Sequence, residues 1–251
     1  MPATESPWRW RAIRLPKHGY PEEECEDAWA ADPAAGRFAV ADGASECAFA
    51  ALWARLLADT LVAAPWPGAV AAWLDAPRRL WLKEVMGLEL PWYAEMKRDE
   101  GAFATLLGLD LRAPVGNRPG GWRAVAIGDT CLVRVRRRHQ VQAFPLSRAA
   151  DFDNQPSLVG SHDVPPPEPL RCAGSFRRGD RLLLMTDALA QWFLGDWERG
   201  GRPWDAIARL LSTARPEEAF AAWIEDLRAA AELRDDDVTL LSIDSSCVPT
   251  E

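Results

Sequence analysis

Apolar residues recur along the chain with two periods, one typical of strands and one typical of helices. Trp and Arg alternate from residue 8 to 14, as in a half-buried strand, and 37–41 (RFAVA) reads as a buried strand. Further strands are expected at 102–111, 122–127, 131–136, 139–144, 180–186 and 237–243. Helical spacing of apolar residues predicts helices at 45–63, after Pro67, and at 187–195, 203–213 and 215–233.

Local signals refine two of these helices. Ser45 is a suitable N-cap for the first helix. The second helix places Val70, Trp73 and Leu74 on one face, and Pro77 is expected to break or kink it.

The order of the elements favours an α+β fold in which helices cover antiparallel sheets. The strands between 102 and 144 fit a meander, and strands and helices do not alternate as a doubly wound parallel sheet requires. The Pro-rich stretch 163–169 reads as a surface loop, because similar strand patterns lie on both sides of it. We therefore expect a single domain over residues 1–251.

Charge argues against two classes of partner. The 251 residues carry a net charge of −8, whereas nucleic-acid binders and proteins held on anionic lipid usually have a basic excess. The basic run 134–138 is interpreted as the solvated turn of a hairpin. The N-terminal sequence MPATESPWRW lacks an apolar segment after a basic start, and no apolar stretch approaches the ~20 residues that span a bilayer. We expect a cytoplasmic protein without a membrane segment.

Cysteine and histidine give little support to metal or nucleophile chemistry of their own. The five cysteines are scattered without a CxxC pair, and no two of the three histidines are close in sequence. This pattern disfavours a disulfide framework, a zinc site and a Ser-His-Asp triad.

Single aspartates stand at the ends of predicted strands. Asp42 stands at the end of the predicted strand 37–41, Asp129 follows the strand 122–127, Asp187 follows the strand 180–186 and Asp236 precedes the last strand. Each alone is typical of a turn or a helix cap. If they converged, their charges would repel and raise their pKa values, and a hard divalent cation such as Mg²⁺ or Mn²⁺ would relieve that repulsion. Two such ions sharing a carboxylate can activate water for in-line attack on phosphorus.

Six segments in order resemble the PP2C (PPM) family of metal-dependent Ser/Thr protein phosphatases, in the manner of a divergent bacterial member. They are ECEDAW (24–29), FAVADGASE (38–46), GAFATLLGL (101–109), VAIGDTCLVRV (125–135), LLLMTDAL (182–189) and DDDVTLLSI (235–243). The resemblance extends from about residue 8 to 244. It implies the family's four-layer α-β-β-α sandwich, in which helix pairs flank two antiparallel sheets.

The resemblance also implies a metal centre. Asp42 matches the aspartate that bridges two metal ions, and Gly43 matches the glycine whose carbonyl oxygen reaches one of them. Glu26 and Asp27 match the acidic pair that serves the same ion, directly or through water.

The remaining matches lie in the second half of the chain. Asp187 and Asp236 match the aspartates that hold the other ion, and Asp129 matches one linked to a third, weaker metal site. The implied reaction is hydrolysis of phosphoserine or phosphothreonine in a protein by a metal-bound hydroxide, with Mn²⁺ or Mg²⁺ as cofactor. The catalytic residues would be Asp42, Asp187 and Asp236, and the partner a phosphoprotein, with the enzyme opposing a Ser/Thr kinase.

The sequence also departs from the family pattern. The arginine that often precedes the acidic pair is absent from GYPEEE, and Arg11, Arg14, Lys17 and His18 are the nearby cations that could replace it. Two glycines are missing from DGASE, and Ala188 replaces the glycine of T-D-G. An alanine at a position that needs φ > 0 would cost about 1 kcal/mol. The segment 151–161 replaces a flap that could select substrate.

Three alternatives remain open at this point. The first is a PP2C-like module that is weakly active or inactive and binds a phosphoprotein or regulatory partner. The second is a cysteine phosphatase, since C-x5-R occurs at Cys131–Arg137 and Cys172–Arg178, although neither cysteine lies in a loop that follows a strand and opens a helix. The third is a metal nuclease that uses the same carboxylates, against which the acidic net charge counts.

Overall fold

The protein is described from a computed structural model that covers residues 8–63, 70–89, 92–113, 120–137, 139–153, 155–162 and 165–244. Within these ranges, none of the helices combines the length and the apolar character needed to cross a membrane.

Two five-stranded antiparallel sheets form the centre of the molecule. The first runs in the order β10-β6-β5-β3-β2, with β2 at Asp27–Asp32, β3 at Arg37–Asp42, β5 at Leu106–Arg112, β6 at Gly120–Ile127 and β10 at Leu170–Phe176. The second runs in the order β1-β12-β11-β7-β8, with β1 at Arg9–Leu15, β7 at Cys131–Arg136, β8 at Gln140–Phe144, β11 at Arg181–Met185 and β12 at Val238–Asp244. A short pair, β4 (Phe103–Ala104) and β9 (Val159–Gly160), forms a separate two-stranded sheet that a bridge between Ala104 and Gly43 links to the end of β3.

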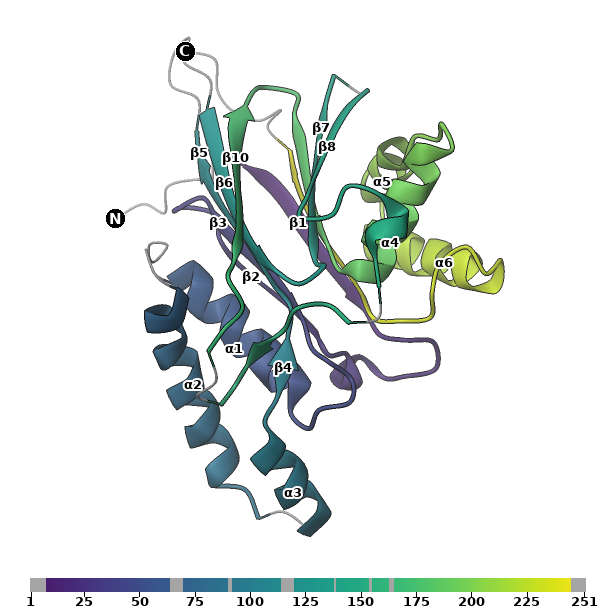
Figure 1. Cartoon of the computed structure of the whole chain (residues 1–251). Helices are drawn as coiled ribbons and strands as arrows, with labels where there is room; N and C mark the ends of the chain where they lie inside the picture. The colour runs from purple at the N-terminus through teal and green to yellow at the C-terminus, as the bar shows by residue number, and fades with distance from the viewer. Residues whose placement is uncertain are drawn as a thin grey trace.

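Helices cover the outer faces of both sheets (Figure 1). On one side lie α1 (Ala50–Ala63) and α2 (Val70–Met86), whereas α3 (Trp92–Glu100) lies beyond the end of the sheets, below β4 in Figure 1. On the other side lie α4 (Asp187–Glu198), α5 (Pro203–Leu211) and α6 (Pro216–Ala229). The expected α+β class and the α-β-β-α layering are confirmed; among the described residues the first sheet has the expected helix pair, and the second has three helices.

Three apolar cores separate the four layers. Trp53, Leu57 and Trp81 lie in the core between the first sheet and its helices. Phe193 and Phe220 lie in the corresponding core of the second sheet. The core between the sheets includes Phe38, Leu107, Trp122, Phe176, Leu184 and Leu241, which are at most 2% exposed. Because this middle core holds the sheets together, it also fixes how their strand ends face one another.

Several local expectations were wrong. The helix α1 begins at Ala50, and Ser45 lies in the preceding turn, where Phe49 has a φ of 63°. The helix α2 is not broken at Pro77, since packing of Trp73, Leu74 and Trp81 outweighs the missing hydrogen bond; the alternative of a kink stays a prediction. The expected strand 102–111 is split between β4 and β5.

The expected meander is also wrong, because the chain crosses from one sheet to the other between β6 and β7. The strands β2 and β10 and the helix α3 were not expected, since DAWAAD and LRCAGSF alternate weakly and WYAEMKRDE is short and polar.

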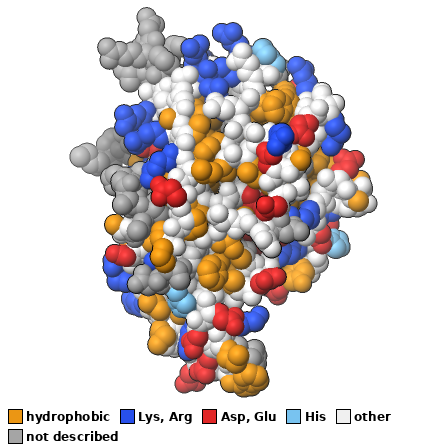
Figure 2. Space-filling view, in the orientation of Figure 1, with side chains coloured by type: hydrophobic (Ala, Val, Ile, Leu, Met, Phe, Trp, Pro, Cys, Tyr) orange, Lys and Arg blue, Asp and Glu red, His pale blue; other side chains and the backbone are white. Residues whose placement is uncertain are grey.

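The basic run at 134–137 is not simply a solvated turn; residue 138 lies outside the described residues. Arg136 forms an ion pair of 2.6 Å with Asp180, and its side chain is 13% exposed. Arg134 donates to the carbonyl oxygen of Ser175. On the face shown in Figure 2, basic side chains gather at the upper end and acidic ones lie mainly across the middle and lower part.

Candidate metal and phosphate site

The predicted site residues stand where strands of both sheets end on the same side of the sandwich. Asp42, the last residue of β3, pairs across the sheet with Asp27, the first residue of β2. In the other sheet, Met185 at the end of β11 pairs with Cys131 and with Leu240, near the starts of β7 and β12. This register explains why aspartates far apart in sequence meet at one end of the molecule.

An open cavity of about 730 Å³ lies at this end. Five of the predicted residues line it, namely Asp42, Gly43, Asp129, Asp187 and Asp236. The other wall residues include Ser45, Cys47, Phe103, Thr105 and Arg234, together with Asp153, Pro156 and Leu158 from the segment 151–161. The replaced flap segment therefore borders the cavity.

Two glycines permit the close approach of backbone at this cavity. A Cβ at Gly43 would lie 2.9 Å from backbone atoms of Ala50 and Glu26. Gly128 has a φ of +94°, and a Cβ there would lie 2.6 Å from the Thr105 side chain. Glycine is thus required by packing at both positions, next to Asp42 and Asp129.

The carboxyl groups of the cluster are difficult to ionise in the absence of a cation. Burial raises the pKa of Asp42 well above its usual range, and the charges of Asp27 and Asp187 raise it further. Burial and the nearby Asp187 raise the pKa of Asp129 to about 7. Burial also raises the pKa of Asp187, although Arg234 opposes the shift. These mutual effects show that the aspartates have converged.

Asp27 lies beneath the cavity and is 1% exposed. Its Oδ2 accepts a hydrogen bond of 2.9 Å from the Thr186 hydroxyl, which in turn accepts the Thr239 N–H at 2.9 Å. Burial raises the pKa of Asp27 well above its usual range. Its Oδ1 and the Oδ1 of Asp129 are buried, and neither has a hydrogen-bond partner among the residues that the structure describes.

The backbone at Glu26 is held by Asp237, which was not among the predicted site residues. Asp237 is 5% exposed; its Oδ1 accepts the Lys17 N–H at 2.8 Å, and its Oδ2 accepts the Glu26 N–H at 2.7 Å. Asp237 therefore fastens the turn before β12 to the chain before β2. The sequence signal that could have identified Asp237 was its position next to the predicted ligand Asp236.

Lys17 is the candidate cation that reaches the acidic residues. Its Nζ lies 3.4 Å from Glu26 Oε2 and 3.7 Å from Asp236 Oδ1. Burial alone would lower the Lys17 pKa, but Asp236 and Glu26 outweigh it and raise the pKa.

The other three candidate cations are engaged elsewhere. Arg11 pairs with Glu217, and His18 pairs with Glu225. Arg14 donates to the backbone oxygen of Asp27 and lies 3.8 Å from Glu22.

Arg234 is the site residue that the sequence reasoning missed. Its Nη2 contacts Asp187 Oδ2 and lies 3.1 Å from Asp236 Oδ2. The signal was an arginine two positions before a predicted ligand, in RDDDVT, a spacing that by itself does not distinguish it from any exposed arginine.

Ala188 causes no backbone strain. It lies in the first turn of α4, and positive φ among the described non-glycine residues occurs at Phe49, Arg137 and Ala231. The expected cost of replacing the T-D-G glycine therefore does not arise here.

The donor set fits a hard divalent cation. The cavity presents carboxylate and backbone oxygens, and two carboxylates each have a buried oxygen without a partner. Among the described residues, however, no three carboxylate, thiol or imidazole groups are already arranged to hold a metal ion. Asp187 and Asp236 instead share the Arg234 guanidinium.

The cysteine alternative is not supported by the structure. Cys131 lies inside β7, is fully buried and donates to the Asp129 backbone oxygen, and burial raises its thiol pKa. Cys172 lies inside β10. Neither thiol has the loop at a helix N-terminus that would stabilise a thiolate and cradle phosphate.

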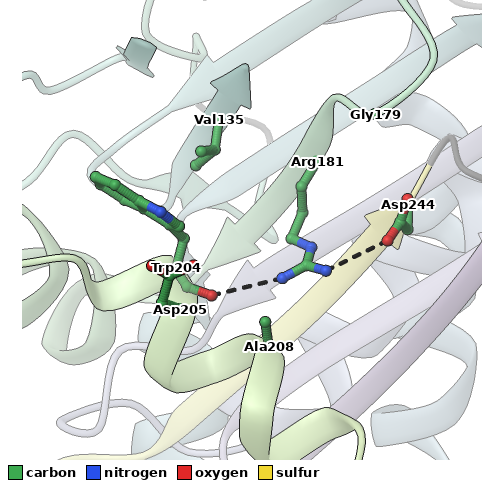
Figure 3. A pocket seen from close by; sticks show the side chains of 7 residues that line it. All are labelled: Val135, Gly179, Arg181, Trp204, Asp205, Ala208 and Asp244. Carbon is green, nitrogen blue, oxygen red and sulfur yellow. Dashed lines mark hydrogen bonds and ion pairs between the residues drawn. The ribbon is translucent and has the colours of Figure 1, made fainter. Parts of the chain in front are cut away.

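A smaller cavity of about 90 Å³ lies at the opposite end of β11 (Figure 3). Arg181 in its wall donates to the Trp204 carbonyl oxygen at 3.5 Å and to Asp244 at 3.3 Å. The Arg181 guanidinium is thus engaged by two groups of the cavity wall.

A known protein family matches most of the chain. The profile of the protein phosphatase 2C family matches residues 16–235. No curated protein sequence matches the chain.

Solved structures share the fold at low sequence identity. The serine/threonine phosphatase PstP/Ppp of Mycobacterium tuberculosis is 20% identical over 94% of this chain and 98% of its own, with a TM-score of 0.62. A PstP catalytic domain in complex with two manganese ions is 22% identical over 94% and 97%, with a TM-score of 0.58. The PPM Ser-Thr phosphatase MsPP from Mycobacterium smegmatis, in complex with cacodylate, is 19% identical over 94% and 97%, with a TM-score of 0.56. The chain belongs to the protein phosphatase 2C family and is a PPM-type protein phosphatase.

Proposed function

We propose that the chain, acting as one domain, hydrolyses phosphoserine or phosphothreonine in proteins with the help of two Mn²⁺ or Mg²⁺ ions. The observation that carries the proposal is the convergence of Asp27, Asp42, Asp129, Asp187 and Asp236 from both sheets, with pKa values of four of them raised by burial and mutual repulsion. Such a cluster is stabilised by bound cations, and the family match supplies the reaction.

In this proposal Asp42 holds both ions, and Asp187 and Asp236 hold one of them. The Gly43 carbonyl, Glu26 and Asp27 serve the other, and Asp129 serves a third, weaker site. The ions, when bound, would supply an activated water and neutralise charge on phosphorus.

The chain's own groups then position these ligands. Thr186 holds the Asp27 carboxylate, and Asp237 fixes the backbone at Glu26. Asp153, Pro156 and Leu158 border the cavity from the segment 151–161, where a protein substrate would pass. The substrate would be a protein phosphorylated by a Ser/Thr kinase.

The test is hydrolysis of p-nitrophenyl phosphate with and without Mn²⁺. Asp42→Asn should lower the Mn²⁺-dependent rate by at least about 100-fold, the upper range for loss of a group that only supports a metal ligand. Asp226→Asn, an exposed aspartate on α6, is the matched control and should keep the wild-type rate. Unchanged turnover in Asp42→Asn contradicts the assigned centre.

A second outcome distinguishes the non-catalytic alternative. A folded wild type that binds Mn²⁺ but hydrolyses neither p-nitrophenyl phosphate nor phosphopeptides would favour a module that binds phosphoproteins without turnover. Metal-dependent cleavage of DNA would favour the nuclease.

A further inference from the structure

Arg234 lies between two of the carboxylates that the proposed function assigns to a metal ion. It belongs to the loop between α6 and β12, and its guanidinium forms ion pairs with Asp187 and, at 3.1 Å, with Asp236. The Asp187 side chain is 14% exposed, whereas that of Arg234 is 38% exposed. One side of the guanidinium therefore contacts the acidic cluster, and the rest of the side chain is exposed at the cavity.

The charges around the cavity make this arginine unusual. Its acidic wall residues are Asp42, Asp129, Asp153, Asp187 and Asp236, with Glu46 at the rim. Among the described residues that line the cavity, Arg234 is the only basic side chain. Lys17, the other nearby cation, does not itself line the cavity but contacts Ser45 and Asp236 in its wall and pairs with Glu26. Arg234 is thus the cationic side chain that a phosphoryl dianion in the cavity would meet directly.

The same carboxylate oxygens cannot hold both Arg234 and a divalent cation at full strength. The guanidinium occupies Asp187 Oδ2 and Asp236 Oδ2, and the described carboxylates are not arranged as a complete metal-ligand group. When Asp187 and Asp236 bind a cation, their attraction for Arg234 is largely cancelled. The side chain would then remain tethered at the cavity edge with its donors free.

A free guanidinium at this edge suits phosphate. Its planar fork of N–H donors binds phosphate oxygens with two parallel charge-assisted hydrogen bonds. The loop before the acidic pair offers no arginine for this task, since Arg14 is held by the Asp27 backbone oxygen.

We propose that Arg234 changes partners: it is the counter-ion of Asp187 and Asp236 before metal binds, and it binds the substrate phosphoryl group afterwards. The inference rests on the proposed function and adds to it a residue from a different part of the chain. Arg234 thus competes with the metal ion and assists the substrate.

The two roles predict opposite effects of one substitution. In Arg234→Gln, Mn²⁺ should bind about fivefold more tightly, since removing a competing half-exposed ion pair is worth ~1 kcal/mol. Inorganic phosphate should bind the Mn²⁺-loaded protein about tenfold more weakly, for loss of a charge-assisted hydrogen bond. Isothermal titration with MnCl₂ and then with phosphate measures both effects without any turnover.

Two further variants control the titrations. Arg215→Gln removes an exposed arginine that pairs with Glu218 and should leave both affinities unchanged. Arg234→Lys keeps the charge but loses the fork, so its Mn²⁺ affinity should stay near wild type while phosphate still binds more weakly. If Arg234→Gln does not fold, Arg234→Lys carries the test through its phosphate affinity.

An unchanged or weaker Mn²⁺ affinity in a folded Arg234→Gln, or an unchanged phosphate affinity in either Arg234 variant, overturns the inference. Because neither titration needs catalysis, a wild type that binds both ligands without hydrolysing substrate contradicts only the proposed function. Normal turnover together with wild-type titrations of Arg234→Gln contradicts only the role of Arg234. Failure of the wild type to bind Mn²⁺ overturns both.

Discussion

The two ends of β11 carry aspartates in opposite circumstances. At the start of the strand, Asp180 is 1% exposed, and its carboxylate accepts hydrogen bonds from Arg136 at 2.6–3.2 Å and from the Arg177 N–H at 2.9 Å. At the other end, Asp187 shares one arginine with Asp236 and lies near Asp42 and Asp129.

The difference lies in how the charge of each buried carboxylate is compensated. Asp180 has a dedicated cation and a backbone donor, so its buried charge is compensated within the fold. The cluster at the far end has more carboxylates than cations and contains buried oxygens without partners. That imbalance should cost stability in the isolated chain, and under the proposed function it would favour the binding of added cations.

The largest effect on stability is expected at the start of β11, where the charge of Asp180 is compensated by Arg136. Asp180→Ala leaves Arg136 buried without its partner, which should lower the free energy of unfolding by about 3 kcal/mol. Urea titration measures the loss, and Asp226→Ala serves as the exposed control. Activity per folded molecule should stay at the wild-type level, because Asp180 lies at the strand's other end. A free energy of unfolding close to that of the wild type would contradict the stabilising role of the Arg136–Asp180 ion pair.

Metal ions should stabilise the other end of β11, where the aspartates outnumber the cations. Mn²⁺ at 100 times its dissociation constant should add about 2.7 kcal/mol to the free energy of unfolding, because the assembled carboxylates exist only in the folded chain. Thermal melts with Mn²⁺ and with EDTA measure this shift. It should shrink in Asp42→Asn and persist in a partly destabilised Asp180→Ala. A melting temperature indifferent to both Mn²⁺ and Mg²⁺ would count against the metal centre.

A smaller effect is expected from pH in the metal-free protein. The folded pKa of Asp129 is raised to about 7 from the usual value of 3.8, so the folded state holds a proton that the unfolded state has lost between these values. Its stabilising contribution is therefore complete below about pH 4 and is lost as the pH rises through 7. Asp42 and Asp187, whose pKa values are also raised, act in the same direction.

Melting temperatures in EDTA should thus be higher at pH 5.5 than at pH 8. Asp129→Asn, which has no proton to lose at this position, should flatten the dependence. An equally steep dependence in Asp129→Asn would show that other groups cause it.

Much of the fold could be predicted from the sequence because its elements have clear local periods. The buried strands RFAVAD, LLGLDLR and RLLLM and the Trp- and Leu-rich helix α1 are examples. The crossing between β6 and β7 could not be predicted, since local patterns do not say which sheet a strand joins. The predicted helix break at Pro77 and the predicted N-cap at Ser45 were wrong because tertiary packing outweighed the local preferences of these residues.

The site divides in the same way. Aspartates at strand ends could be singled out because a short polar residue after an apolar run is visible in sequence, and six ordered motifs suggested that they meet. The partners of these aspartates could not be predicted, because Arg234, Asp237 and Thr186 act through contacts between residues up to 220 positions apart.

The Thr186 hydroxyl joins β2 of one sheet to β12 of the other, through Asp27 and the Thr239 N–H. A chain cut between β6 and β7 would give two fragments, one carrying Asp27, Asp42 and Asp129 and the other carrying Thr186, Asp187 and Asp236. Neither fragment would contain the complete set. Enzymatic turnover by the recombined pieces would then act as a split reporter. Its signal requires that the two fragments have associated in register, since β1 of the first pairs with β12 of the second and β10 of the second pairs with β6 of the first.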